Sequence, residues 1–315
     1  MEFELIRPGV HRLVAEPASV TVGLIVGARS ALLVDSGSST EQGRQLRRAA
    51  ARATAVPLRH VVVSHGHWDH IDGLAAMADL EIIAHDSLRP ALATAGLLGG
   101  GSAAEASVPP VAADSPSSRG AADTSDPHDG AGPHSPSGGT GPNSAADSPN
   151  AADSPDGGGV TLLASIGLRD LGGVTVEIAH FGPAHTDGDL IVAVPEARVV
   201  FAGDLVETLG PPQFDQTSDL LGWAKSLDAL RGLLRPDTVV VPGHGRLAQA
   251  WDVDHQRQGL TAIWDQAEWA YRQGVELDQV YAFDQLEWPW DEATARQGIA
   301  AAYRALARRL GPLPG

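Results

Sequence analysis

The stretch HVVVSHGHWDH, residues 60–70, constrains this chain more than any other segment. A β-branched apolar run, Val61–Val63, leads directly into three histidines and an aspartate within six positions. Such a run is typical of a short buried strand. Three interpretations compete for the residues that follow it: a metal site, a surface charge cluster and an accident of composition. A surface cluster would not directly follow a buried strand, and the pattern is rare by composition, so the metal site is favoured.

The spacing of these side chains supports the same interpretation. His65 and His67 stand two positions apart, so in an extended or turning segment they point the same way and can share one ion. Asp69 and His70 fall on the other side of the turn, where a second ion can bind. Zinc accepts imidazole nitrogen and carboxylate oxygen as ligands. The chain has no cysteine, which excludes disulfides, iron–sulfur clusters and thiolate ligands, so nitrogen and oxygen must hold any metal.

The charge balance narrows the classes of partner. The chain has 22 Lys and Arg against 39 Asp and Glu, a net charge of −17. Such a surface repels phosphate backbones and anionic lipid heads, so nucleic acid and membranes are disfavoured and a small-molecule substrate is favoured. The first residues, MEFELIRPGVHRL, include the acids Glu2 and Glu4 and do not read as a signal peptide. No run is long enough to cross a bilayer, so we expect a cytoplasmic protein.

One internal segment differs from the rest of the chain. Residues 99–159 are almost all Gly, Ala, Ser, Pro and Asp, and the pentapeptide AADSP recurs within them. A segment with so little apolar surface cannot offset its ordering entropy, so we predict a disordered insertion. We expect it to interrupt one domain at 1–250, which is followed by a helical extension at 251–315.

Strands and helices are predicted on both sides of the insertion. Ser38, with Glu41 three residues later, resembles a capping box that opens a helix through Ala53. Further helices are predicted at 71–79 and 219–234 and through the tail. Strands flanked by helices in both halves indicate an α/β protein with two stacked sheets covered by helices. The predicted strands are 20–27, 31–37, 59–65, 80–85, 174–182, 189–195, 198–204 and 238–245.

Further metal ligands are expected where other strands end, because loops on a rigid scaffold carry functional groups. His185 follows a predicted strand in HFGPAHTDGD, Asp204 ends the strand of VVFAGDL, and His244 stands between two glycines in VVVPGHG. His180 lies only five residues before His185 but inside the predicted strand, so we expect it to pack rather than to bind metal.

With these motifs in this order, the chain resembles the metallo-β-lactamase superfamily over about residues 5–98 and 160–250. The resemblance implies a four-layer αββα sandwich with metals at one edge of the sheets. Asp35 of LLVDSG matches an early strand-end aspartate that is expected to orient a ligand histidine. A strand-terminating turn is the alternative role for it. Ser64 stands where many relatives have threonine. The implied ligands are His65, His67 and His185 for a first ion, Asp69, His70 and His244 for a second, and Asp204 as a bridge between them.

The resemblance also implies an activity. Two divalent ions, zinc with iron or manganese as alternatives, can hold a hydroxide between them, with Asp69 and Asp204 as the candidate catalytic residues. We expect hydrolysis of an ester, thioester, lactone or amide of a small molecule. Phe214, in the loop after Asp204, is a candidate pocket wall, with a purely structural loop as the alternative. Two other functions stay open: a mononuclear iron oxygenase of the same fold, similar to persulfide dioxygenases, and a non-catalytic binding protein.

Overall fold

The computed structural model describes residues 1–98, 158–280 and 289–313. The predicted disordered insertion at 99–159 therefore lies outside the described residues, except for Gly158 and Gly159. No helix in the described ranges is long and apolar enough to cross a membrane.

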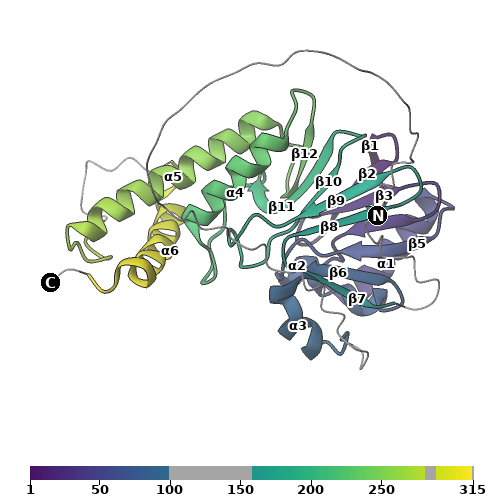
Figure 1. Cartoon of the computed structure of the whole chain (residues 1–315), viewed down its shortest axis with the longest axis horizontal. Coiled ribbons are helices and arrows are strands. Elements are labelled where there is room, and N and C mark those ends of the chain that lie inside the picture. Colours follow the sequence, from purple (N-terminus) through teal and green to yellow (C-terminus); the bar gives the residue numbers. More distant parts are fainter. Residues whose placement is uncertain (99–157, 281–288, 314–315) are drawn as a thin grey trace, which may run out of the picture. The chain divides into compact units, whose positions relative to one another are not determined.

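In the part of the chain that the structure describes, twelve strands form one hydrogen-bonded sheet: ten lie along one path with two halves, and β1 and β2 branch from it at β3 (Figure 1). In the first half the order is β7-β6-β5-β4-β3, with β2 on β3 and β1 on β2, and in the second it is β12-β11-β10-β9-β8. A single register pair, His244 with Val20, joins β12 to β3. The strands are β1 (Glu4–Arg7), β2 (Val10–Ala15), β3 (Val20–Val26), β4 (Ala31–Val34), β5 (Leu58–Val62), β6 (Glu81–His85), β7 (Val160–Leu163), β8 (Ile166–Asp170), β9 (Thr175–Ala179), β10 (Ile191–Val194), β11 (Val199–Glu207) and β12 (Val239–His244).

The two halves face each other across a shared apolar core. Side chains alternate between the two faces of a strand. Leu32 of β4 accordingly joins an inner cluster that also contains Val192 of β10, whereas its neighbour Leu33 joins a different cluster on the outer face. Phe201 of β11 packs so closely on Gly23 of β3 that a Cβ at position 23 would lie 2.4 Å from its ring. The inner cluster thus fills the space between two sheets.

Helices cover the outer faces of both sheets. Leu46 of α1 packs with the outer face of the first half, and Trp223 of α4 packs with the outer face of the second. Figure 1 shows α4, α5 and α6 grouped together, and they share one apolar cluster with β10 and β11. The predicted four-layer αββα sandwich is confirmed. The helices are α1 (Thr40–Ala53), α2 (Trp68–Ile71), α3 (Arg89–Thr94), α4 (Leu220–Leu233), α5 (Ala250–Arg272) and α6 (Glu292–Leu310).

The first helices differ from the sequence prediction in detail. Ser39, not Ser38, caps α1, because the Ser39 Oγ accepts the Gln42 N–H at 3.2 Å. The predicted helix at 71–79 is wrong: α2 ends at Ile71, and a short 3-10 helix follows at Leu74–Met77. Gly73 separates the two, since its N–H donates to the Gly37 carbonyl, and a Cβ there would lie 1.8 Å from the Ser36 carbonyl oxygen.

Several strands also differ from the prediction. Strands β1, β2, β7 and β8, which lie at or near a sheet edge, were not predicted. Strand β11 continues to Glu207, so Asp204 lies inside a strand rather than at its end. Strand β9 ends at Ala179, so His180 follows the strand instead of lying within it. The expected start of the helical tail agrees with the start of α5 at Ala250.

Candidate metal centre

The motif at 65–70 crosses from the end of β5 into α2. His65 and His70 are fully buried, whereas His67, the residue before α2, is partly exposed. Strand β5 pairs in parallel with β4 and β6, so the carboxyl ends of these three strands meet at one edge of the sheet. This edge places the motif beside residues from the second half of the chain.

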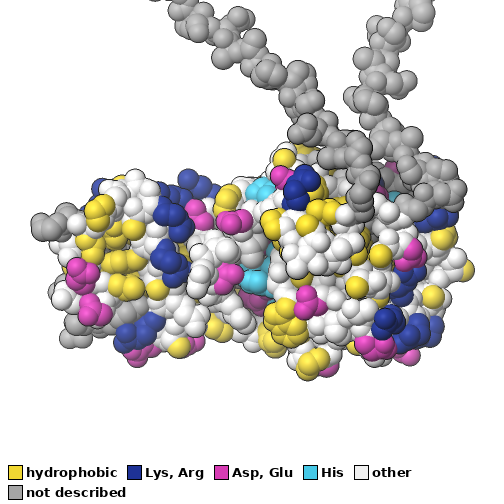
Figure 2. Space-filling view, turned by 90° about the horizontal axis from the view of Figure 1, so that it is seen from below, with side chains coloured by type: hydrophobic (Ala, Val, Ile, Leu, Met, Phe, Trp, Pro, Cys, Tyr) yellow, Lys and Arg dark blue, Asp and Glu magenta, His cyan; other side chains and the backbone are white. Residues whose placement is uncertain are grey.

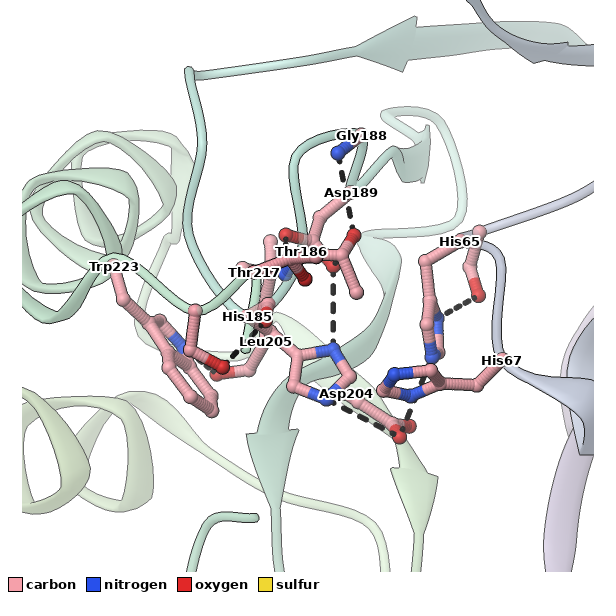
Figure 3. A network of polar contacts seen from close by, with 12 residues as sticks. His65, His67, His185, Thr186, Gly188, Asp189, Asp204, Leu205, Thr217 and Trp223 are labelled. Atoms are coloured by element: carbon pink, nitrogen blue, oxygen red, sulfur yellow. Dashed lines mark hydrogen bonds and ion pairs between the residues drawn. The ribbon is translucent and has the colours of Figure 1, made fainter. Parts of the chain in front are cut away.

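Three histidines and Asp204 form one candidate metal site. One nitrogen from each of His65, His67 and His185 and one Asp204 oxygen all lie within 4.8 Å of one another. The three rings are mutually close, with each pair of centroids 4.7 Å apart. Figure 3 shows the rings of His65 and His185 directed at the Asp204 carboxylate. We call His65, His67 and His185 the first metal group.

A second set of ligand atoms lies on the other side of Asp204. Donor atoms of Asp69, His70 and His244 also lie within 4.8 Å of one another, and we call these residues the second metal group. The His244 Nε2 lies 3.2 Å from the Asp69 Oδ2. His244 ends β12, the strand that joins the two sheet halves, so the second metal group forms where the halves meet.

Asp204 turns one oxygen toward each group. Its Oδ2 lies 3.5 Å from the His65 Nε2 and 4.0 Å from the His185 Nε2. Its Oδ1 lies 3.3 Å from the His70 Nε2 and 3.6 Å from the His244 Nε2. Gly243 makes room for this side chain, since a Cβ there would lie 1.8 Å from the Asp204 Oδ1. The carboxylate therefore occupies the position of a bridge between the two groups.

A family comparison agrees with this geometry. The model of the metallo-beta-lactamase superfamily matches residues 15–244, which include both metal groups. The chain belongs to this superfamily. Among solved structures, a metallo-beta-lactamase from Pontibacter korlensis is similar in fold, with a TM-score of 0.54 and 17% sequence identity. The alignment covers 82% of this chain and 98% of that one. No curated protein sequence matches the chain significantly.

Asp35 contacts His70, a member of the second metal group, on the side of the ring away from Asp204. Its Oδ2 accepts the His70 Nδ1–H at 2.8 Å, and its Oδ1 accepts the Ser64 N–H at 2.7 Å. A proton on Nδ1 leaves the Nε2 lone pair of His70 free to face Asp204. Asp35 also has a φ of 69°, a left-handed conformation that aspartate tolerates better than most residues.

Two carboxylates that the sequence analysis did not single out hold histidines of the first metal group. Asp189 Oδ1 lies 3.3 Å from the His185 Nδ1, and this carboxylate also accepts the Thr186 N–H at 2.7 Å. Asp215 Oδ2 lies 3.0 Å from the His67 Nε2, so that ring has its Nδ1 left for a ligand role. The spacing of four residues from His185 could have identified Asp189 in the sequence. No comparable pattern in the sequence points to Asp215.

His180 takes no part in either group among the described residues. Its Nδ1 lies 2.9 Å from the Asp189 carbonyl oxygen, and its ring packs on His85 with centroids 4.0 Å apart. The histidine therefore supports the loop that carries His185 from outside the cluster.

The buried polar atoms of the site fit a cation. The His65 Nε2, His70 Nε2 and Asp204 Oδ1 are all buried without a hydrogen-bond partner of good geometry. Buried polar atoms are rarely left unsatisfied, and unpaired nitrogen and carboxylate oxygen atoms that converge are the donors that a divalent ion needs. The two groups supply these donors without any thiolate.

The electrostatics point the same way. Burial opposes protonation of His70, but the Asp204 and Asp35 carboxylates outweigh it and raise the pKa of this imidazole well above its usual value. Burial and the neighbouring His70 lower the pKa of His65. Burial opposes ionisation of Asp204, but His70 and His65 hold its pKa well below the usual range. The cluster thus keeps a buried negative charge among imidazoles, which is the charge pattern of a cation site.

A cavity of about 680 Å³ opens onto both metal groups. Four carboxylates line it, and no Lys or Arg does among the described residues: the acids are Asp69, Asp204, Glu207 and Asp215. Apolar side chains at the lining include the exposed Trp68 and Leu209 and the predicted wall residue Phe214. Figure 2 shows histidine and acidic side chains together in a hollow of this surface.

Proposed function

We propose that the protein is a metal-dependent hydrolase with a two-ion centre that cleaves an ester, thioester, lactone or amide of a small molecule. The observation that carries the proposal is the position of Asp204, which turns one oxygen toward each of two histidine-rich groups. Bound together, two divalent ions, zinc in the first instance, would lower the pKa of a shared water from 15.7 to about 7 and so supply a hydroxide at neutral pH.

The chain's own residues prepare this chemistry. Asp35 and Asp189 fix the ring orientations of His70 and His185, so each imidazole presents its Nε2 toward Asp204. Trp223 packs behind His185, with ring centroids 5.2 Å apart, and donates its indole N–H to the Leu205 carbonyl at 2.9 Å. Because this support is rigid and buried, the donors need little rearrangement when an ion binds.

The cavity supports a neutral or cationic substrate with an apolar part. Outside the two metal groups the described lining has no Lys or Arg that could pair with a strongly anionic compound such as a glutathione thioester. Trp68 and Leu209 are both more than half exposed at the lining, although large apolar side chains usually bury more of their surface. We propose that they contact an apolar acyl or leaving group.

A substrate panel tests the proposal. The purified protein, loaded with Zn²⁺, is assayed on matched ester, thioester, lactone and β-lactam substrates, each with an apolar neutral and an anionic acyl group. We expect turnover of at least one neutral compound, with the anionic partner at least tenfold slower in kcat/KM. Oxygen consumption with a persulfide by protein that contains a single iron would replace the proposal with an iron oxygenase. If the protein bound compounds of the panel but turned none of them over, it would be a non-catalytic binding protein.

A further inference from the structure

Glu207 lies close to the second metal group, although no motif in the sequence identified it as a candidate. It is the last residue of β11, and in the parallel pairing of β11 with β12 its register partner is His244. One oxygen of Glu207, one oxygen of Asp204 and one nitrogen of His244 lie within 4.8 Å of one another. The side chain therefore reaches the same space as two residues of the candidate metal centre.

The Glu207 carboxylate has no partner of its own in the described part of the chain. Its backbone N–H donates to the Gln256 Oε1 at 2.9 Å, but its carboxylate makes no hydrogen bond or ion pair there. A partly buried carboxylate close to the Asp204 carboxylate is repelled by it unless a cation neutralises the charge.

Two buried polar atoms beside Glu207's neighbours also indicate a bound cation. The Asp204 Oδ1 and the His70 Nε2 both belong to residues more than nine-tenths buried, and neither has a hydrogen-bond partner of good geometry. These are the atoms of Asp204 and His70 that face each other at 3.3 Å, on the side of Asp204 where His244 also lies. An ion placed among them would satisfy both atoms.

We propose that Glu207 is an additional ligand of the ion held by the second metal group. That ion would then have donors from Asp69, His70, His244, Asp204 and Glu207, which are three carboxylates and two imidazoles. The first metal group has three imidazoles and shares only Asp204. Carboxylate oxygen suits harder ions such as Mn²⁺, whereas imidazole suits zinc. The two positions therefore differ in the ion that they prefer, with the second more tolerant of Mn²⁺.

The test measures metal affinity, because this proposal rests on the two-ion centre of the proposed function and not on its reaction. Metal-free wild-type, Glu207→Gln and Glu207→Ala proteins are titrated with Zn²⁺ and with Mn²⁺ against a competing chelator. Glu196→Gln is the control, since Glu196 is exposed on the turn between β10 and β11. Glutamine has the shape of a protonated glutamate, so we expect the Glu207→Gln protein to fold, and thermal melting checks this. The alanine variant serves as the second measurement.

In both Glu207 variants we expect the ion of the second metal group to bind at least about tenfold less tightly, the ion of the first metal group to bind within about threefold of wild type, and the loss to be larger for Mn²⁺ than for Zn²⁺. Supporting groups around metal ligands are worth 10- to 100-fold in affinity, and a direct ligand should not be worth less. Wild-type affinity for both ions in either folded variant would overturn the proposal and leave Glu207 as a group that contacts substrate.

Failure of the inference can be distinguished from failure of the proposed function. Wild-type protein that binds two ions, loses one in the Glu207 variants and hydrolyses nothing in the substrate panel would refute the hydrolase and retain the ligand. Wild-type protein that hydrolyses a substrate, and whose Glu207 variants keep both ions at wild-type affinity, would refute only the ligand.

Discussion

The two metal groups are held in different ways, although they share Asp204. In the second group the supporting pair is His70 with Asp35, whose side chains are 0% and 2% exposed and lie within the sheet core. The first group has one pair that is equally buried, His185 with Asp189, and one that is not: the side chains of His67 and Asp215 are 33% and 40% exposed. A buried pair is little screened by solvent, whereas a partly exposed one is weakened by water and salt. The second group is therefore held by the sheet and the first partly by a surface loop.

The loop that carries Asp215 depends on distant parts of the chain. Asp215 Oδ1 accepts the Thr217 N–H at 2.6 Å and the Ser218 N–H at 3.1 Å, which folds the loop on itself. Arg304 of α6 donates to the Asp215 carbonyl at 2.7 Å. The geometry of His67 is thus linked to α6 through this contact.

Loss of the shared carboxylate should have the largest effect, since it removes the one residue on which both groups depend. In Asp204→Ala we expect turnover to fall by about three orders of magnitude or more, because activation of a metal-bound water is worth up to about eight pKa units. Metal content should fall as well. Steady-state kinetics and elemental analysis of the purified variant measure both.

His180→Ala is the matched control for Asp204→Ala. His180 is close to His185 in the chain, but its imidazole bonds the Asp189 carbonyl and packs on His85. We expect its replacement to cost no more than ordinary packing, with metal content unchanged. The assignment of both residues would be wrong if the His180→Ala protein lost its metal and the Asp204→Ala protein kept it.

The metal affinities of the two groups should depend on pH to different degrees. In the metal-free protein, burial opposes protonation of His70 and His244, but Asp204 and Asp35 raise the pKa of His70, and Asp69 and Asp204 raise that of His244. Protons therefore compete with metal at both residues from above the usual histidine value, and affinity falls as pH falls. In the first group Asp189 raises the pKa of His185, but the pKa of buried His65 is lowered.

We expect the second ion to lose up to about 100-fold in affinity per pH unit through this range, and the first about tenfold, because each displaced proton contributes about a factor of ten per unit. Chelator competition at pH 8, 7 and 6 measures the two slopes. If affinity changed equally with pH for both ions, the predicted electrostatic difference between the two groups would be wrong.

Asp35→Asn should weaken the second ion by about 10- to 100-fold and the first much less. Asparagine tolerates the left-handed backbone of position 35 and can still accept the Ser64 N–H, but it is a weaker acceptor for the His70 Nδ1–H. Chelator competition on the folded variant provides the measurement. A larger loss at the first ion would show that Asp35 supports the loop as a whole rather than His70.

Asp215→Asn should give the smallest effect, a loss of up to about tenfold in affinity for the first ion, because its pair with His67 is partly exposed and screened. The loss should shrink as salt is raised. Asp187→Asn, an exposed aspartate beside His185, is the control and should change neither affinity. A salt-independent loss of 100-fold would mean that the loop holds the first group as firmly as the sheet holds the second.

This contrast also explains what the sequence could predict. The motif at 65–70 is contiguous, and its ligands reach both groups through one turn and one short helix, so local spacing was sufficient to find them. The apolar runs of the strands, flanked by helices in both halves, likewise predicted two stacked sheets, and the family resemblance implied the four-layer sandwich. Asp204 was singled out as the end of a strand, but its strand is longer than predicted, and the register of β11 on β12 shifts at Gly203 and again before Glu207.

Residues whose positions depend on tertiary structure were missed. Glu207 reaches the centre only because β11 continues three residues beyond Asp204 and pairs with β12. Asp215 is brought to His67 by a loop with no periodic pattern and by a contact with Arg304, 89 residues away. Local sequence patterns contain neither the register of a sheet nor the path of such a loop, so these residues could be identified only in the folded structure.

The most direct test of the two-group account is the metal content of the purified wild-type chain, measured by elemental mass spectrometry against protein concentration from quantitative amino-acid analysis. The account predicts two divalent ions per chain after dialysis against metal-free buffer at pH 8, and one or fewer in Asp204→Ala. A wild-type chain that holds a single ion under these conditions, after prior incubation with both Zn²⁺ and Mn²⁺, would contradict it.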